Sequence, residues 1–181
     1  MAKTEETLRL EREIWNSTHK QGTFCCFEVT IGWHGKERVD YITYDTNGIW
    51  RCFEIKVSKA DFHSKANNSF LGHFNYYVLT NELYKQVKDE IPNHIGVYVL
   101  GSSVKKAKKQ TLQVDEQILK DSMIRSLYRE VEKQIKSNDP LIVDSLNRKI
   151  SRLETEKKNY YRKYWDLYTE VQEKYGTRWN K

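Results

Sequence analysis

Apolar side chains near the start of the chain follow first a helical and then a strand-like spacing. Residues 4–19 place most of their apolar side chains on one side of a helix, at Leu8, Leu10, Ile14 and Trp15. Thr4 is expected to open this helix together with Thr7, because a hydroxyl oxygen accepts a free N–H of the first turn. Gln21-Gly22 ends the helix, and the aromatic and β-branched residues of 24–31 predict a strand.

Two further strands follow, joined by a tight turn. Residues 39–44 and 49–57 are typical of strands, and Asp45-Thr46-Asn47-Gly48 between them indicates a hairpin, because Asn and Gly tolerate positive φ. The remaining elements are expected as a helix at 58–65 with Ser58 as its N-cap, a strand at 76–80, a helix at 82–89 and a strand at 95–100. This order predicts an α/β fold with a mixed sheet covered by helices.

After Gly101 the pattern becomes that of long helices. Residues 115–136 predict one helix, Asn138-Asp139-Pro140 interrupts it, and 141–174 contains neither Pro nor Gly. Apolar and tyrosine side chains in the last segment alternate three and four residues apart, which is the period of a coiled coil. One core position of the heptad holds Val143, Ile150, Lys157, Tyr164 and Val171, and the other holds Leu146, Leu153, Tyr160 and Leu167.

This apolar stripe is longer than a small domain covers, so we expect a helical extension at 115–181 after a domain at 1–114. Pairing with a second copy of the chain, as a homodimer, buries the stripe. Folding back onto the helix at 115–136 is the alternative. Lys157 in a core position favours a registered assembly of few helices, at some cost in stability.

Composition adds a preference for a polyanionic partner. The 181 residues carry a net charge of +6, and 38% are hydrophobic, which suits one modest core and an extended, solvated part. No stretch is long and apolar enough to cross a membrane, and Met1-Ala2-Lys3 does not begin a signal peptide. Cys25, Cys26 and Cys52 lie among apolar residues without the spacing of a zinc site, so we expect reduced thiols in a cytoplasmic protein.

Three charged residues interrupt the apolar strands and are the candidates for chemistry. Asp40 lies in the second strand, and Glu54 and Lys56 share a face of the third, because alternate strand residues point the same way. Such charges are costly to bury unless they are paired or hold a metal. A three-residue loop at 46–48 places Asp40 directly opposite Glu54, whereas a two-residue loop places the two on opposite faces.

Two carboxylates and an ammonium group on one patch suit the hydrolysis of a phosphodiester. The carboxylates offer the oxygen ligands that Mg²⁺ prefers, and the metal acidifies a water and polarises the phosphoryl oxygen. The lysine orients that water or stabilises the developing negative charge.

The segments around these charges resemble the PD-(D/E)xK nuclease superfamily. Glu28-Val29-Thr30, Arg38-Val39-Asp40 and the run 54–62 are similar in order and spacing to MmcB-like DNA-repair nucleases. The run 10–14, with Glu11, and the run 54–61 also resemble the archaeal Holliday-junction resolvases. Val39 stands where the motif has its proline, and the tract 67–72 departs from the MmcB-like pattern.

The resemblance implies a restriction-endonuclease-like αβββαβ core and Mg²⁺-dependent cleavage of DNA, with Mn²⁺ able to substitute. It implies Asp40 and Glu54 as metal ligands, Lys56 as the base that positions water, and Glu11 as a further carboxylate. Repair, recombination or a phage or mobile-element process is the implied setting. Nothing in the resemblance covers residues 101–181.

Other residues admit both a functional and a structural interpretation. Glu28 is either a further metal ligand or an outward strand residue, and Asp61 is either part of the site or a helix cap. Six lysines are candidate phosphate contacts, with solvated helix or loop positions as the alternative: Lys59, Lys65, Lys105, Lys106, Lys108 and Lys109.

Three functions compete on this sequence. The first is a metal-dependent DNA endonuclease, which the intact set of Asp40, Glu54 and Lys56 favours. The second is a catalytically idle nuclease-fold module that binds DNA or a protein and assembles through its coiled coil. The third is a structural coiled-coil adaptor, which predicts a seam without polar residues and is disfavoured by Lys157.

Overall fold

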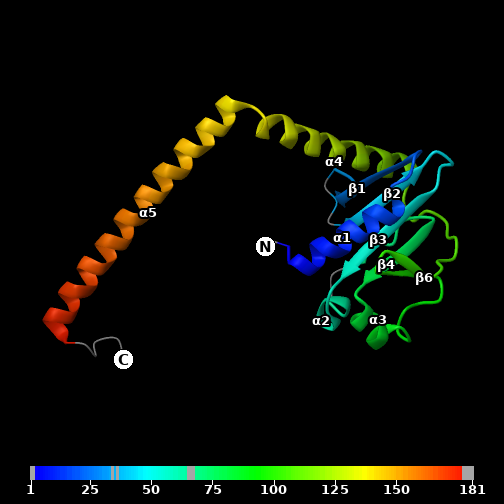
Figure 1. Ribbon diagram of the computed structural model, residues 1–181, viewed down its shortest axis with the longest axis horizontal. Helices are drawn as coiled ribbons and strands as arrows, with labels where there is room; N and C mark the ends of the chain where they lie inside the picture. The colour runs from blue at the N-terminus through cyan, green and yellow to red at the C-terminus, as the bar shows by residue number, and fades with distance from the viewer. Residues whose placement is uncertain (1–2, 34, 36, 65–67, 177–181) are drawn as a thin grey trace. The chain divides into compact units, whose positions relative to one another are not determined.

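The computed structural model describes residues 3–33, 35, 37–64 and 68–176 of the chain (Figure 1). Contacts divide the chain into two compact units, Met1–Arg129 and Glu130–Lys181. The first unit holds the sheet and the second holds the long C-terminal helix, and each is described by itself.

A six-stranded mixed sheet forms the first unit, and its strands lie side by side in chain order. The strands are β1 (Thr23–Thr30), β2 (Arg38–Asp45), β3 (Trp50–Lys56), β4 (Phe74–Leu79), β5 (Gly96–Val99) and β6 (Ser102–Lys105). β1, β2 and β3 are antiparallel, β3, β4 and β5 are parallel, and β6 returns antiparallel beside β5. The predicted α/β class and the mixed sheet are therefore confirmed.

Strand β6 was not predicted, and the expected loop containing Lys105 is wrong at that residue. Val99 pairs with Ser102, so only Leu100 and Gly101 form the turn. Leu100 and Gly101 have φ angles of 48° and 72°, and a two-residue hairpin turn of type I′ requires positive φ at both positions. A leucine rarely adopts such a conformation, and so the turn left no signal in the sequence.

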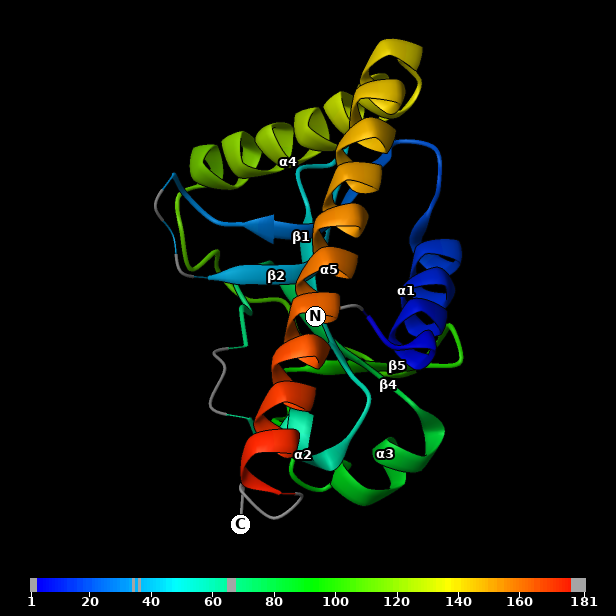
Figure 2. The ribbon, with the colours of Figure 1, turned by 90° about the vertical axis from the view of Figure 1, so that its left-hand side faces the viewer.

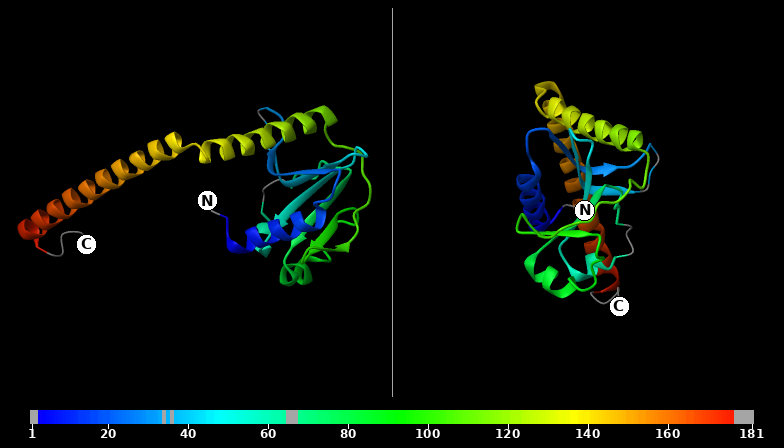
Figure 3. Two further views of the ribbon diagram at one scale, coloured as in Figure 1. Left: turned by 45° about the horizontal axis from the view of Figure 1, so that its top comes forward. Right: turned by 90° about the vertical axis from the view of Figure 1, so that its right-hand side faces the viewer.

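Helices cover the two faces of the sheet (Figures 2 and 3). On one face, α1 (Glu5–Thr18) packs Leu10 and Ile14 against Tyr41 and Phe53. On the other face, the first turns of α4 (Glu116–Ser137) and the helix α3 (Asn81–Val87) complete two further apolar clusters. The predicted start of α1 is confirmed, because the side chain of Thr4 accepts the N–H of Thr7.

The hairpin between β2 and β3 has the length that the candidate site requires. Tyr44 pairs with Trp50, and the N–H of Asp45 donates to the carbonyl of Ile49, so residues 46–48 form a three-residue loop. The carboxylate of Asp45 accepts the N–H groups of Asn47 and Ile49 and fixes this turn. Of the two loop lengths that the sequence left open, the structure contains the three-residue loop, and its register places Asp40 level with Glu54.

The first turns of α4 belong to the sheet-containing unit, although the sequence suggested that the helical extension starts at Asp115. Leu119 and Met123 are buried beside Trp50. The hydroxyl of Ser122 accepts the N–H of Gly32 at 2.9 Å, and the guanidinium of Arg125 donates to the Gly32 carbonyl at 2.8 Å. These contacts explain why the first unit runs to Arg129.

The second unit contains the 36-residue helix α5 (Pro140–Tyr175), which confirms a long C-terminal helix. Asp139 caps it by accepting the N–H groups of Leu141 and Ile142, and Pro140 fits the first turn because its missing N–H has no helical partner. None of its described side chains is buried. Among the described residues, no helix is long and apolar enough to span a membrane.

Replacing Leu119 with alanine is expected to lower the free energy of unfolding by about 2–5 kcal/mol, because it opens a cavity between α4 and the sheet. The matched control is Ile124→Ala on the same helix, where 64% of the side chain is exposed, with an expected change below about 0.5 kcal/mol. Urea unfolding followed by tryptophan fluorescence measures both. Equal losses in the two variants contradict the packing of α4 on the sheet.

Candidate active site

The backbone ladder between β2 and β3 stops just before the candidate site. Its last pair is Tyr41 with Phe53. Two residues beyond Phe53, the N–H of Ile55 donates to a carboxylate oxygen of Asp40 at 2.9 Å instead of to a backbone carbonyl. The two strands separate at this point, and the side chain of Asp40 is held beside Glu54.

The neighbouring strand extends this row of acidic residues. Phe27 pairs with Tyr41 and Val29 pairs with Val39, so Glu28 of β1 occupies the position opposite Asp40. Glu28 has a positive φ of 52°, which is uncommon for a residue with a side chain. Three adjacent strands therefore present carboxylates at the same level of the sheet, and the backbone is strained at one of them.

Glu54 and Lys56 lie deep in the sheet, with 3% and 6% of their surfaces exposed. The ammonium nitrogen of Lys56 lies 3.9 Å from a Glu54 oxygen and 3.9 Å from an Asp61 oxygen. The second Glu54 oxygen accepts the N–H of Ser69 at 3.2 Å, and Asp61 accepts the N–H of Val57. Lys56 is therefore held between two carboxylates that the backbone itself positions.

Asp61 also belongs to the first turn of α2 (Lys59–Phe62). The Ser58 side chain accepts the N–H of Asp61, as the sequence predicted for this helix start. The two interpretations of Asp61 thus coincide, because it stands in the cap structure and its carboxylate faces Lys56.

The two central carboxyl groups hold their protons more tightly than free carboxyl groups do. Burial, together with the charge of the neighbouring Asp40 carboxylate, raises the pKa of Glu54 to about 8, although Lys56 opposes this rise. Burial also raises the pKa of Asp40, opposed by the hydrogen bond from Ile55 and by the charge of Lys56. A like-charged pair held in this way is unfavourable when ionised, and a nearby cation relieves it.

These residues line one cleft with a volume of about 910 Å³. Six acidic and three basic side chains surround it, so its walls carry an excess of negative charge: Glu11, Glu28, Glu37, Asp40, Glu54, Asp61, Lys3, Arg38 and Lys56. The structure therefore brings together all four residues that the resemblance marked as catalytic, Asp40, Glu54, Lys56 and Glu11.

The outer wall of the cleft contains two basic residues that the sequence did not single out. The ammonium group of Lys3 contacts Glu11 at 2.5 Å and Glu28 at 2.7 Å, and Arg38 lies 3.6 Å from Glu28. Lys3 precedes the first helix and is distant from Glu28 in sequence, so no local pattern indicated this contact. Arg38 stands two residues before Asp40, within a segment that the resemblance had already marked.

Lys59, Lys65 and Lys105 differ in their relation to this cleft. Lys59 is exposed on α2, which follows directly after β3. Lys65 lies outside the described residues. The ammonium group of Lys105 donates to the carbonyls of Ile91 and Pro92 at 3.0 and 2.9 Å, so its proposed use as a phosphate contact is replaced by a structural one.

Lys106, Lys108 and Lys109 are exposed, but they lie at the opposite end of the strands from the cleft. The N–H of Lys108 donates to His94, just before β5, and the N–H of Gln110 donates to His73, just before β4. Because β4 and β5 run parallel to β3, this segment lies at the end of the sheet where β3 begins. The cleft lies where β3 ends, roughly 20 Å away along the strand.

Asp40 and Glu54 suit Mg²⁺, which binds proteins through one or two carboxylates and keeps several waters. Within 3–33, 35, 37–64 and 68–176, no three His, Cys, Asp or Glu side chains are arranged as a ready metal cage. The donor set is the buried carboxylate of Glu54 and the partly buried carboxylate of Asp40, whose repulsion a divalent cation would offset. The residues present therefore fit a partly hydrated Mg²⁺ ion better than a soft metal.

Comparisons with known proteins bear on the fold alone. No protein-family model matches the sequence, and no curated protein matches it either. A similar fold occurs in a solved structure, the SPO1766 protein of unknown function from Silicibacter pomeroyi, with a TM-score of 0.60 and 18% sequence identity. The matched region covers 77% of this chain and 95% of that one.

The raised pKa of Glu54 makes the metal-free protein lose stability as the pH rises. The ordinary pKa of this group is 4.5 and its folded value is about 8, so the folded state binds the proton more tightly between these values. The stabilisation is complete below pH 4.5 and is lost as the pH rises through about 8, by on the order of 5 kcal/mol.

Glu54→Gln removes this titration and is expected to become more stable than the wild type as the pH passes from 5 to 9. Urea unfolding in the presence of a chelator measures the difference at each pH. Glu82→Gln, an exposed change on α3, is the control and keeps the wild-type pH dependence. If Glu54→Gln keeps the pH dependence of the wild type, the raised pKa of Glu54 is contradicted.

Proposed function

We propose that this protein is a metal-dependent DNA endonuclease of the PD-(D/E)xK kind. The observation that carries the proposal is the convergence of Asp40, Glu54 and Lys56 on one cleft, at the point where β2 and β3 separate. The order α1, β1, β2, β3, α2, β4 supports a restriction-endonuclease-like αβββαβ core. The resemblance of the surrounding segments to this superfamily adds to that support.

Each residue has a role that follows from its surroundings. Asp40 and Glu54 would hold Mg²⁺, which when bound polarises the phosphoryl oxygen and acidifies a water. Lys56 keeps its ammonium group at the cleft, where it orients water and stabilises negative charge on the phosphate. Glu11 adds a carboxylate at the cleft wall, which Lys3 holds in place.

DNA as the substrate rests on the charge of the chain and on the exchangeable ion pairs at the cleft entrance. The net charge of +6 favours a polyanion. Arg38 is more than half exposed and only loosely paired with Glu28, so it is free to turn to a phosphate. Lys59 is exposed beside the end of β3, and we place backbone contacts there and not on the lysines at 106–109.

A second candidate function is favoured by α5, whose apolar side chains are exposed along its length. In this alternative the nuclease fold is catalytically idle and binds DNA or a protein, while α5 forms a coiled coil in a homodimer. We propose the coiled coil for both alternatives. The thiols of Cys25 and Cys52 support a reducing, cytoplasmic setting, and repair, recombination or a phage or mobile-element process is the proposed pathway.

Cleavage of DNA with Mg²⁺ tests the choice between the two alternatives. Lys56→Met keeps the volume of the side chain, removes its charge, and is expected to lower the cleavage rate by about 10²–10³-fold. Asp40→Asn is expected to lower it at least as much, because it removes a ligand charge. A panel of linear and branched DNAs provides the substrates.

The matched control for cleavage is Lys88→Met, an exposed lysine after α3, with the wild-type rate expected. Wild-type rates in both Lys56→Met and Asp40→Asn rule out the assigned site. No cleavage by the wild-type chain on any member of the panel favours the idle module.

Binding of the metal itself has a readout that does not depend on cleavage. Mg²⁺ at about 100 times its Kd stabilises the folded state by about 2.7 kcal/mol, which raises the Tm by several degrees at pH 8. Glu54→Gln and Asp40→Asn are expected to lose this rise, and Glu82→Gln to keep it. Thermal unfolding with and without Mg²⁺ measures the shift. An equal rise in all variants places the metal elsewhere.

A further inference from the structure

The helix α5 carries a continuous apolar seam that nothing in its own unit buries. The exposed fractions of its side chains include 54% for Leu146, 52% for Ile150, 49% for Leu153 and 59% for Leu167. At about 1.5 Å per residue, the 36 residues extend roughly 54 Å. A seam of this length with a seven-residue period fits another helix of the same period, and a second copy of this chain supplies one.

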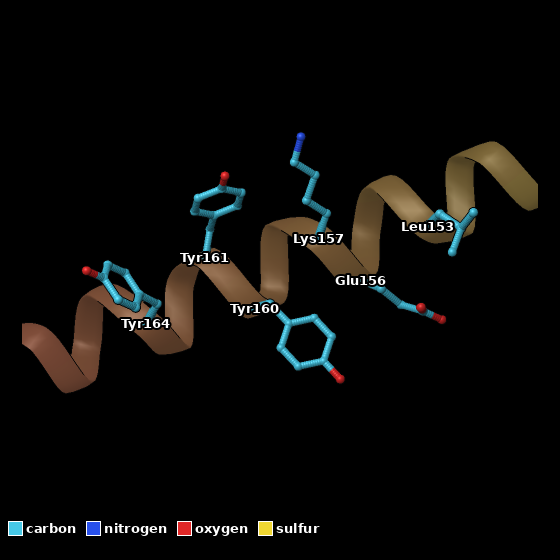
Figure 4. Close-up of a pocket in the computed structure, with 6 residues that line it drawn as sticks. All are labelled: Leu153, Glu156, Lys157, Tyr160, Tyr161 and Tyr164. Carbon is cyan, nitrogen blue, oxygen red and sulfur yellow. The ribbon is translucent and has the colours of Figure 1, made fainter. Parts of the chain in front are cut away.

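The middle of the seam is a shallow groove, and its lining is unusual for a coiled coil. Figure 4 shows Leu153, Glu156, Lys157, Tyr160, Tyr161 and Tyr164 around it. The groove has a volume of about 540 Å³. It comprises two successive holes of the kind that receives a partner's side chain: one bounded by 153, 156, 157 and 160, the next by 157, 160, 161 and 164.

The direction of the second helix decides what enters these holes. In a parallel pair, equivalent residues lie level, so the partner's Lys157 enters the first hole directly beside Lys157. In an antiparallel pair centred between residues 158 and 159, Lys157 lies level with the partner's Tyr160. The partner's Tyr160 then enters the first hole, and the two ammonium groups are displaced by about 4.5 Å along the axis.

The aromatic surroundings favour the second arrangement. The ammonium group of Lys157 already lies 5.8 Å from the centre of the Tyr161 ring within one helix. In the antiparallel pair, the partner's lysine enters the hole that Tyr160, Tyr161 and Tyr164 line, where tyrosine rings attract a cation. The same centre keeps the seam from Val143 to Lys174 in register along its whole length.

The charged residues beside the seam agree with this direction. In each heptad, a charged residue comes directly before the first core position: Lys149, Glu156, Lys163 and Glu170. In an antiparallel pair these residues lie beside those of the partner helix, so Lys149 pairs with the partner's Glu170 and Glu156 with the partner's Lys163. Symmetry repeats both pairs. In a parallel helix pair, Lys149 meets the partner's Glu154, and the other three charges, Glu156, Lys163 and Glu170, each face a tyrosine of the partner.

We propose that α5 forms an antiparallel coiled-coil homodimer centred between Lys158 and Asn159, with Lys157 packed against the tyrosines of the second copy. The proposal rests on the coiled-coil part of the proposed function and is independent of the nuclease chemistry. The first residues of the two α5 helices lie at opposite ends of the stalk, about 55 Å apart.

Charge reversal in the full-length chain tests both the partner and its direction. The wild type is expected to have the mass of a dimer at micromolar concentration, and Lys149→Glu to weaken dimerisation about tenfold, because it turns two attractive pairs into repulsive ones. Adding Glu170→Lys restores the wild-type Kd, since the pair is re-formed with opposite signs. Sedimentation equilibrium at low salt measures each Kd, and circular dichroism checks that the helix content is unchanged.

The matched control is Lys149→Glu combined with Glu154→Lys, which is expected to stay weak. Restoration by Glu154→Lys and not by Glu170→Lys reverses the direction and overturns the antiparallel arrangement. A monomer mass for the wild type at all concentrations overturns the second copy as the occupant, and shows that the seam is covered within one chain. These masses do not depend on cleavage, so a failure of the nuclease proposal leaves this test intact.

Discussion

The hydrogen bond from the N–H of Ile55 to the carboxylate of Asp40 takes the place of the next backbone pairing between β2 and β3. A buried N–H needs an acceptor, so this bond prevents Asp40 from turning out to water. Asp40 therefore stays beside Glu54, and burial makes it costly for the pair to be fully ionised. The sheet therefore keeps two carboxyl groups in an arrangement that is unfavourable when both are ionised and that a cation would relieve.

The inner and outer parts of the cleft differ in how firmly they are held. Backbone N–H groups fix Asp40, Glu54 and Asp61, and Lys56 lies between two of these carboxylates. The outer wall consists of partly exposed ion pairs around Lys3 and Arg38, and such pairs contribute little to stability in water. A polyanion can therefore exchange partners with the outer residues without disturbing the inner ones. This division between a fixed centre and an exchangeable rim suits a site that must admit a long charged substrate.

The sequence predicted the residues at the centre of this cleft but not the ion pairs at its entrance. The period of two in a strand placed Glu54 and Lys56 on one face, and the turn signal at 45–48 predicted the hairpin, but only the structure shows the three-residue loop that brings Asp40 opposite Glu54. Lys3 could not be foreseen in the same way, because its contacts with Glu11 and Glu28 depend on where α1 crosses the sheet. The lysines at 106–109 share a loop in the sequence, but only the parallel direction of β4 and β5 shows that this loop lies at the end of the strands opposite the cleft. Local patterns predicted the elements, while strand order and direction decided which charges meet.

The C-terminal helix shows the same limit in another form. An apolar seam buries similar side chains in either direction, so the heptad period predicts a helical partner without orienting it. The orientation depends on the residues that break the apolar rule: Lys157 within the seam, and the alternating charges Lys149, Glu156, Lys163 and Glu170 beside it. In a parallel pair the two lysines lie level and most of the flanking charges lack opposite partners, whereas in an antiparallel pair each meets a tyrosine or an opposite charge. A polar residue that lowers the stability of the seam is thereby the residue that gives it a direction. In the proposed dimer the first residues of the two α5 helices lie at opposite ends of the stalk, and the proposed nuclease chemistry needs only Asp40, Glu54 and Lys56 of one chain.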